Sequence, residues 1–124
     1  MRVSFTDREL DIMAVLWDKG PSNAREVRAA LKDDLAYNTV LTMLRILEDK
    51  GFVGRVEEGR AHRYHALVAR KAAGKSALAR IQEKVFGGSR ELLLTELLGD
   101  AKLNASELRR LRHFVGERIK KEDK

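Results

Sequence analysis

The first twenty residues follow the pattern of an amphipathic helix with a marked start and end. Thr6 and Glu9 have the spacing of a capping box, in which each side chain accepts the backbone N–H of the other residue. Gly20 and Pro21 then stop helical propagation. Between these signals the apolar residues recur in two stripes, Leu10, Met13, Ala14 and Trp17 in one and Ile12 and Leu16 in the other. We expect one helix here, covered on two sides.

Two more helices are predicted before residue 51. Asn23 and Glu26 form a weaker capping box, which opens a short helix with Val27, Ala30 and Leu31 as its inner face. Residues 32–34 are polar and predict a turn. A third helix is expected over residues 37–50, because Val40, Leu44 and Leu47 share one face at i, i+4 and i+7.

The apolar pattern changes its period after residue 51. Residues 52–57 and 61–67 are typical of two strands, and Glu58-Gly59-Arg60 predicts the turn of a β-hairpin between them. Three helices followed by a two-stranded ribbon is the layout of a winged helix-turn-helix. The predicted fold is therefore mainly α with a small β-hairpin. A winged helix-turn-helix DNA-binding domain is expected over residues 1–70 and a helical dimerisation region over residues 71–124.

The C-terminal region is predicted to hold three helices with more apolar surface than one short helical hairpin can bury. Gly87-Gly88 separates the first from a leucine-rich second helix, and Asn104 with Glu107 forms the capping box of the last. An isolated chain would expose this surface as a large patch. We therefore predict a homodimer whose interface contains Leu78, Ile81, Val85, Leu93, Leu97, Leu111, Val115 and Ile119.

Composition and charge narrow the possible partners. The 124 residues suffice for one modest domain, or for one small domain with an appendage. The absence of cysteine excludes disulfides, thiolate metal sites and cysteine nucleophiles. A net charge of +6 favours an acidic partner, nucleic acid first. In the N-terminal region the basic surplus lies in residues 55–71, where Arg55, Arg60, Arg63, Arg70 and Lys71 face only Glu57 and Glu58.

Nothing in the sequence predicts insertion into a membrane. The longest apolar runs are only a few residues, too short for a transmembrane helix. Residues 1–5 lack the apolar segment of a signal peptide. The expected location is the cytoplasm.

The third helix is the predicted DNA-reading element. In a helix-turn-helix the second helix of the pair enters the major groove, where each base pair presents a distinct pattern of donors and acceptors. Asn38, Thr42 and Arg45 lie opposite the apolar face, and an arginine there can bind guanine with two hydrogen bonds. Tyr37 and Thr39, close to the helix start, are better placed for phosphate.

The hairpin supplies a second predicted contact with double-stranded DNA. Arg60 stands at its tip, with His62 and Arg63 beside it. Such residues suit the sugar-phosphate backbone or the adjacent minor groove. A polar helix face alone is usually only solvated, so the prediction of DNA binding depends on the combination of this face with a capped partner helix and a basic hairpin.

Several motifs resemble the penicillinase-repressor family, which includes repressors of the BlaI, MecI and CopY types. Residues 6–13 with Leu16-Trp17 resemble the family's opening, and residues 38–44 and 58–64 match its recognition helix and wing. The similarity continues through residues 86–89 and 103–111. The resemblance implies a homodimeric repressor that binds palindromic operators and dimerises through its C-terminal helices, with a membrane-bound sensor protease as a candidate partner.

Three departures from the family pattern are visible: the first predicts a different base preference, and the other two leave the inducing signal open. The family's recognition helix often has an arginine where this chain has Ile46, preceded here by Arg45. The β-lactam repressors are cleaved at an Asn-Phe bond, and Glu96-Leu97 occupies that place in this chain. The copper repressors use a C-terminal cysteine cluster, which a chain without cysteine cannot build.

Two other classes of function compete with DNA binding. A catalytic or metal site is not expected, since His62 and His65 point to opposite faces of a strand and His113 lies on another element. No catalytic residue, metal ligand or cofactor is therefore predicted; a metal-responsive regulator, with His65 joining a ligand across a dimer, stays an alternative. The other alternative is a winged-helix protein-interaction module, which Leu41 and Ile46 would favour if they are exposed.

Overall fold

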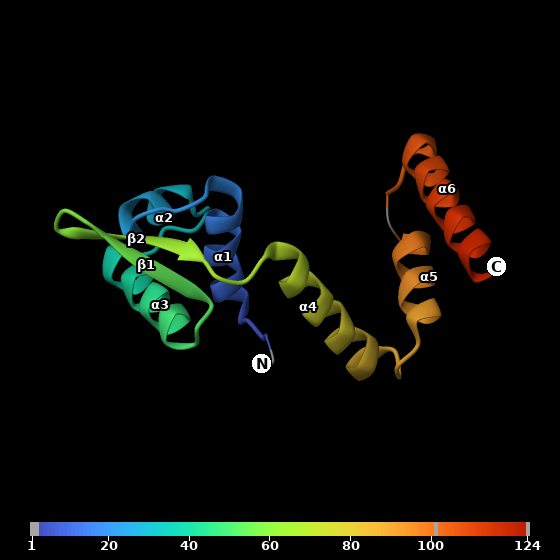
Figure 1. Ribbon diagram of the computed structural model, residues 1–124, viewed down its shortest axis with the longest axis horizontal. Helices are drawn as coiled ribbons and strands as arrows, with labels where there is room; N and C mark the ends of the chain where they lie inside the picture. The colour runs from blue at the N-terminus through green and yellow to red at the C-terminus, as the bar shows by residue number, and fades with distance from the viewer. Residues whose placement is uncertain (1–2, 101, 124) are drawn as a thin grey trace. The chain divides into compact units, whose positions relative to one another are not determined.

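The computed structural model describes residues 3–100 and 102–123, and the chain divides into two compact units between Arg80 and Ile81 in the sequence. Met1 and Arg2, part of the segment on which the absence of a signal peptide was predicted, lie outside the described residues. The elements are α1 (Asp7–Lys19), α2 (Ala24–Ala30), α3 (Tyr37–Asp49), β1 (Val53–Glu58), β2 (Ala61–Ala66), α4 (Arg70–Val85), α5 (Arg90–Asp100) and α6 (Ala105–Glu122) (Figure 1). This order confirms the predicted mainly helical fold with one hairpin.

Local capping explains where α1 and α2 start. The Thr6 hydroxyl accepts the N–H of Glu9 at 3.1 Å, and the Glu9 carboxylate accepts the N–H of Thr6 at 2.8 Å. Asn23 and Glu26 exchange the same pair of bonds at the start of α2. Gly20 follows α1 with a φ of 81°, which a glycine adopts without strain. The predicted boxes are thus confirmed, and each satisfies N–H groups that a helix start leaves free.

The first unit encloses one hydrophobic core between the three helices and the hairpin. Val40, Leu44 and Leu47 of α3 are fully buried, as predicted. The predicted inner stripes are only partly right. The core takes Ile12, Met13, Val15 and Leu16 from α1 and leaves Leu10 exposed and Trp17 at its edge, while Ala30 of α2 is exposed. The stripe of Ile12 and Leu16, with the residues next to it, faces the core. The reason is that α2, α3 and β2 all contact α1.

The hairpin is an antiparallel pair that is joined to the helices through Tyr64. Strands β1 and β2 pair from Val53 opposite Ala66 to Glu58 opposite Ala61, and the turn extends beyond the helices (Figure 1). Ser22, between α1 and α2, exchanges two backbone hydrogen bonds with Tyr64, at 2.9 and 2.8 Å. The Tyr64 side chain is itself buried in the core. The arrangement is a winged helix-turn-helix, with α2 and α3 as the helix pair and β1–β2 as the wing.

The first three turns of α4 belong to the same unit. The Trp17 indole N–H donates to the carbonyl of Val68 at 2.8 Å, and Ser76 donates to the carbonyl of Val3 at 2.6 Å. Arg70 pairs with Asp18 at 2.6 Å. The unit therefore extends ten residues past the predicted end of the DNA-binding domain at residue 70. The functional division between residues 1–70 and 71–124 stays a prediction.

The second unit comprises the end of α4 with α5 and α6. Of the side chains described between Ile81 and Asp123, none is buried. Its local structure is nevertheless well specified, because Ser89 caps α5 and Asn104 forms a capping box with Glu107 at the start of α6. Among the described residues, no helix is long and apolar enough to cross a membrane.

Candidate nucleic-acid interface

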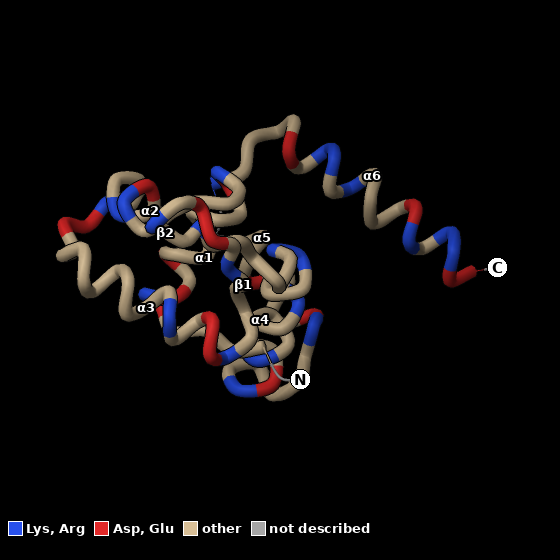
Figure 2. The backbone as a smooth tube through the Cα atoms, turned by 60° about the vertical axis from the view of Figure 1, so that its left-hand side comes forward, with Lys and Arg blue, Asp and Glu red and all other residues tan. Residues whose placement is uncertain are grey.

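The face of α3 opposite its buried residues is polar and open. Asn38, Thr42 and Arg45 are all exposed on it. The first two turns of the helix contain no charged residue, so Arg45 provides the first charge along α3 (Figure 2). Within residues 3–100 and 102–123 Arg45 forms no ion pair, whereas Arg55 nearby in sequence pairs with Glu48 at 3.1 Å. The guanidinium of Arg45 is therefore free to bind another molecule.

The start of α3 differs from that of α1, α2 and α6. Its N-cap is Ala36, and no side chain caps the first turn. Tyr37 and Thr39 are exposed in this turn, and no acidic residue lies in it. The N-terminus of a helix carries a partial positive charge and unpaired N–H groups, which an anion can satisfy. The geometry here suits a phosphate group.

The turn between α2 and α3 is held by two arginines. Arg8 of α1 pairs with Asp33 in the turn. Arg28 of α2 donates from Nε to the carbonyl of Leu35 at 2.8 Å. Both interactions fix the path by which the chain enters α3, and hence the position of the α3 N-terminus.

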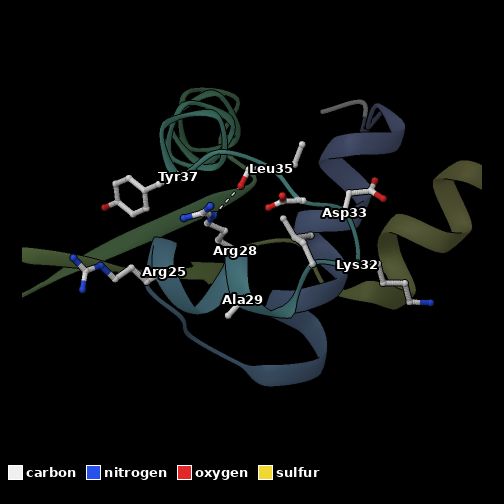
Figure 3. A pocket seen from close by; sticks show the side chains of 9 residues that line it. Arg25, Arg28, Ala29, Lys32, Asp33, Leu35 and Tyr37 are labelled. Atoms are coloured by element: carbon white, nitrogen blue, oxygen red, sulfur yellow. Dashed lines mark hydrogen bonds between the residues drawn. The ribbon is translucent and has the colours of Figure 1, made fainter.

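An open basic groove lies beside this turn, between α2 and the start of α3. Its lining includes Arg25, Arg28, Lys32 and Tyr37, together with Asp33 and Asp34. Arg25 and Tyr37 extend in the same direction at one end of the groove, whereas Lys32 and Asp33 lie at the other end (Figure 3). Arg25 and Tyr37 thus place a cation and a hydroxyl group next to the uncapped end of α3.

The opposite end of α3 is fixed by a buried carboxylate. Glu9, only 4% exposed, accepts a hydrogen bond at 2.7 Å from Nζ of Lys50, the C-cap residue of α3. Burial alone would raise the pKa of Glu9, but hydrogen bonds from Lys50 and Thr6 outweigh it and hold the pKa below its usual value. The start of α1 is thereby joined to the end of α3.

The three predicted wing residues have different surroundings. Arg60 is exposed in the turn, next to Gly59, whose φ of 63° forms the bend. His62 is half-buried, and its Nδ1 is buried without a hydrogen-bond partner among the described residues. Arg63 bonds to Glu58, Glu26 and the carbonyl of Pro21. Of the three, Arg60 is therefore the exposed one, and it forms no ion pair among the described residues.

The residues predicted for dimerisation lie on exposed apolar surface. On α4, Leu78, Ile81 and Val85 share one face and are exposed; Leu93 on α5 is half-buried. The remaining exposed members of the predicted set are Leu97, Leu111, Val115 and Ile119. Positive and negative residues are interspersed along α6 (Figure 2), so its charged side has no single sign.

The sequence profile of the family described as penicillinase repressor matches residues 5–117. This chain belongs to the penicillinase repressor family. It is 35% identical over 118 residues to the transcriptional regulator BlaI of Mycobacterium tuberculosis, covering 90% of this chain and 82% of that protein. It is 21% identical over 112 residues to the methicillin resistance regulatory protein MecI of Staphylococcus aureus, covering 89% and 91%. The family consists of transcription repressors, so the prediction that the chain is not an enzyme agrees with its membership.

Solved structures of other regulators share the fold. A MarR family protein from Bacillus stearothermophilus superposes with a TM-score of 0.51 at 20% identity, covering 98% of this chain and 78% of that one. A transcriptional regulator from Thermotoga maritima gives 0.51 at 22% identity, covering 96% and 80%. At these identities the likeness concerns the winged-helix fold alone.

Two features of this interface were not predictable from the sequence, the place of Arg25 and the partners of Arg63. Arg25 was not singled out, although its place two residues after the Asn23 cap put it at the start of the helix that precedes α3. Arg63 was predicted as a DNA contact with no sign of its partners. Pro21 is 42 residues away in the sequence, and no local pattern connects the two positions.

Proposed function

We propose that this member of the penicillinase repressor family is a cytoplasmic, homodimeric repressor that binds a palindromic operator in double-stranded DNA. The observation that carries the proposal is the exposed polar face of α3 with its free Arg45 and uncapped N-terminus. Occupation of the operator excludes the transcription machinery sterically. A β-lactam or stress-response operon is the proposed target, on the ground of family membership.

In this proposal α3 lies in the major groove. Asn38, Thr42 and Arg45 face the base edges, where Arg45 binds a guanine through O6 and N7. Tyr37, Thr39 and the free end of α3 contact phosphate. Arg25 adds a further phosphate contact from α2, because it extends to the same side as Tyr37 (Figure 3). These phosphate contacts fix the register in which Arg45 reads a base.

The wing reaches the neighbouring backbone or minor groove. Arg60 at its tip is exposed, and its charge is available to phosphate. His62 lies on the same ribbon and contributes a polar edge beside it. The wing thus adds affinity that depends on salt and carries little sequence information.

A second copy of the chain is the proposed partner of the exposed apolar residues. A single recognition helix reads only a few base pairs, too few to select one site in a genome. Two copies related by a twofold axis read two half-sites separated by a whole number of helical turns. The complete absence of buried side chains among those described from Ile81 to Asp123 supports an interface there.

Release from the operator is proposed to follow a route other than cleavage at an Asn-Phe bond. Glu96 and Leu97 occupy the corresponding place, within α5. A membrane-bound sensor protease remains the partner suggested by the family, and we expect one with Asn-Phe specificity to leave this chain intact. Incubation with such an activated protease and mass analysis tests this; a clean cut after Glu96 would contradict it.

Selection from a random-sequence DNA pool tests the proposed function directly. We expect the full chain to enrich one inverted repeat, and Arg45→Ala to lose the preference at one position of each half. Enrichment of no sequence would contradict sequence-specific binding. It would instead favour the protein-interaction alternative, for which the 43% exposure of Ile46 on α3 is the relevant observation.

A further inference from the structure

Arg63 is the most extensively bonded arginine of the wing. Its Nε donates to Oε2 of Glu58 at 2.6 Å, and its Nη2 lies 3.3 Å from Oε1 of the same carboxylate. Nη1 donates to the carbonyl of Pro21 at 2.7 Å, and Nη2 also lies 3.3 Å from Oε1 of Glu26. All three nitrogens of the guanidinium therefore have partners within the chain.

These partners come from three separate segments. Glu58 is the last residue of β1 and stands two residues before Arg60. Pro21 lies in the turn between α1 and α2, and Glu26 is in the first turn of α2. Arg63 thus joins the tip of the wing to the helix pair. A two-stranded ribbon is marginally stable alone, so a bond across its outer half restricts its angle to the helices.

The charge of Arg63 is already balanced. Two carboxylates, Glu58 and Glu26, lie within 3.3 Å of its guanidinium nitrogens. The hydrogen bond and charge of Arg63 lower the pKa of Glu58, so that carboxylate is ionised at neutral pH. A phosphate at Arg63 would compete with these two carboxylates for the guanidinium, whereas Arg60 forms no ion pair among the described residues.

We propose that Arg63 is a positioning residue. It bonds to Glu58 on the wing and to Pro21 and Glu26 at the start of α2, and so holds the wing tip where Arg60 meets the DNA backbone. The proposal depends on the proposed DNA-binding function and replaces the direct phosphate contact predicted from the sequence. If the proposal is right, Glu58 favours DNA binding, although its negative charge lies close to the negatively charged DNA. Exposed single ion pairs have little effect on stability, but a bidentate arginine in a network fixes geometry.

The sign of the effect of Glu58→Gln distinguishes the two roles. The probe is a fluorescein-labelled duplex that the unmutated chain selects from a random pool, followed by anisotropy over a range of salt concentrations. If Arg63 positions the wing, Glu58→Gln weakens binding about threefold to tenfold. If Arg63 contacts phosphate, Glu58→Gln frees its charge, and binding becomes tighter with a steeper salt dependence.

Three further variants complete the test. Arg63→Lys keeps the positive charge but lacks the planar guanidinium that binds several partners at once. A positioning role therefore predicts that Arg63→Lys loses nearly as much DNA affinity as Arg63→Gln. The Glu58→Gln/Arg63→Gln pair should bind no more weakly than the worse single variant, since both break the same bond. Arg60→Gln is the matched control, which should reduce the salt slope by about 0.9 per protomer. Thermal unfolding of each variant checks that the core of the first unit is intact.

The outcomes separate the inference from the proposed function. Weaker binding by Glu58→Gln with an unchanged salt slope supports the positioning role. Tighter binding by Glu58→Gln, or full retention of affinity by Arg63→Lys, overturns it while DNA binding stands. Failure of the unmutated chain to bind any duplex would overturn the proposed function itself.

Discussion

The two units of the chain have equally clear local signals but opposite packing. Asn23 with Glu26 and Asn104 with Glu107 form the same capping box, one in each unit. In the first unit the helices so defined enclose a core in which Ile12, Val40 and Leu44 are fully buried. Of the side chains described from Ile81 to Asp123, none is buried. The same capping box thus marks a helix start in both units, whereas among the described residues only the first unit encloses a core.

The exposed apolar residues of the second unit are the basis of the proposed dimer. Large exposed apolar patches on a protein usually mark an interface. Leu97 is 52% exposed, and Leu111, Val115 and Ile119 are exposed on α6. A second copy that covers these residues would bury their side chains in the dimer, as the core buries those of the first unit. The following variants test this contrast.

A charge on the proposed interface should have the largest effect. Leu97→Asp places a carboxylate on surface that the proposed dimer would bury, twice per dimer, and should give monomers. Loss of the second half-site should then weaken binding to the selected inverted repeat about 10²- to 10⁴-fold. Thr95→Asp, an exposed polar position on the same helix, is the matched control and should retain affinity. Tight binding by a monomeric Leu97→Asp would contradict the account.

The same leucine truncation should act differently in the two units. Leu44→Ala removes a fully buried side chain and should lower the free energy of unfolding of the first unit by about 2–5 kcal/mol. Leu97→Ala should leave that unit unchanged and weaken the dimer. Denaturant unfolding followed by Trp17 fluorescence, with sedimentation alongside, separates the two effects, because Trp17 lies at the edge of the first core. Equal loss of first-unit stability would show that the units are not independent.

Within the first unit, base reading should be sensitive to Arg45. Arg45→Ala removes an exposed side chain that has no ion pair among the described residues, so folding should be unaffected. Specific binding should weaken by about 1–3 kcal/mol, with relaxed preference at one position of each half-site. Titrations with the selected duplex and with duplexes changed at single positions measure this. An equal loss for every sequence would mean that Arg45 contacts only the backbone.

The bond between Glu9 and Lys50 should make the first unit sensitive to acid. The pKa of Glu9 is lower in the folded chain than its ordinary value, so the ionised carboxylate stabilises the fold. This contribution is present above the ordinary glutamate pKa and is lost as the pH falls through the folded value. At neutral pH, Glu9→Gln should lower the free energy of unfolding by about 1–2 kcal/mol. The free energy of unfolding of the variant should also change less as the pH falls into the acid range. The measurement is unfolding of both proteins at a series of pH values from neutral to acid. An equal loss of stability with falling pH in the variant and the unmutated chain would contradict this prediction.

Features set by residues three or four apart were predictable from the sequence. The caps of α1, α2 and α6 and the buried face of α3 are of this kind. Which stripe of α1 faces the core was not predictable, because periodicity shows that a face is apolar without showing which elements cover it. The partners of Arg63 were hidden for a similar reason, since the fold brings Pro21 and Glu26 beside the wing from distant parts of the sequence.

Hydrogen–deuterium exchange across a dilution series tests the contrast between the units most directly. On dilution below the dimer dissociation constant, amides of residues 81–123 should lose protection, and Leu97→Asp should lack that protection at every concentration. Amides of α1 and α3 should keep theirs throughout, because the core of the first unit is complete in one chain. Equal protection of residues 81–123 in the dilute chain, or in Leu97→Asp, would contradict the account.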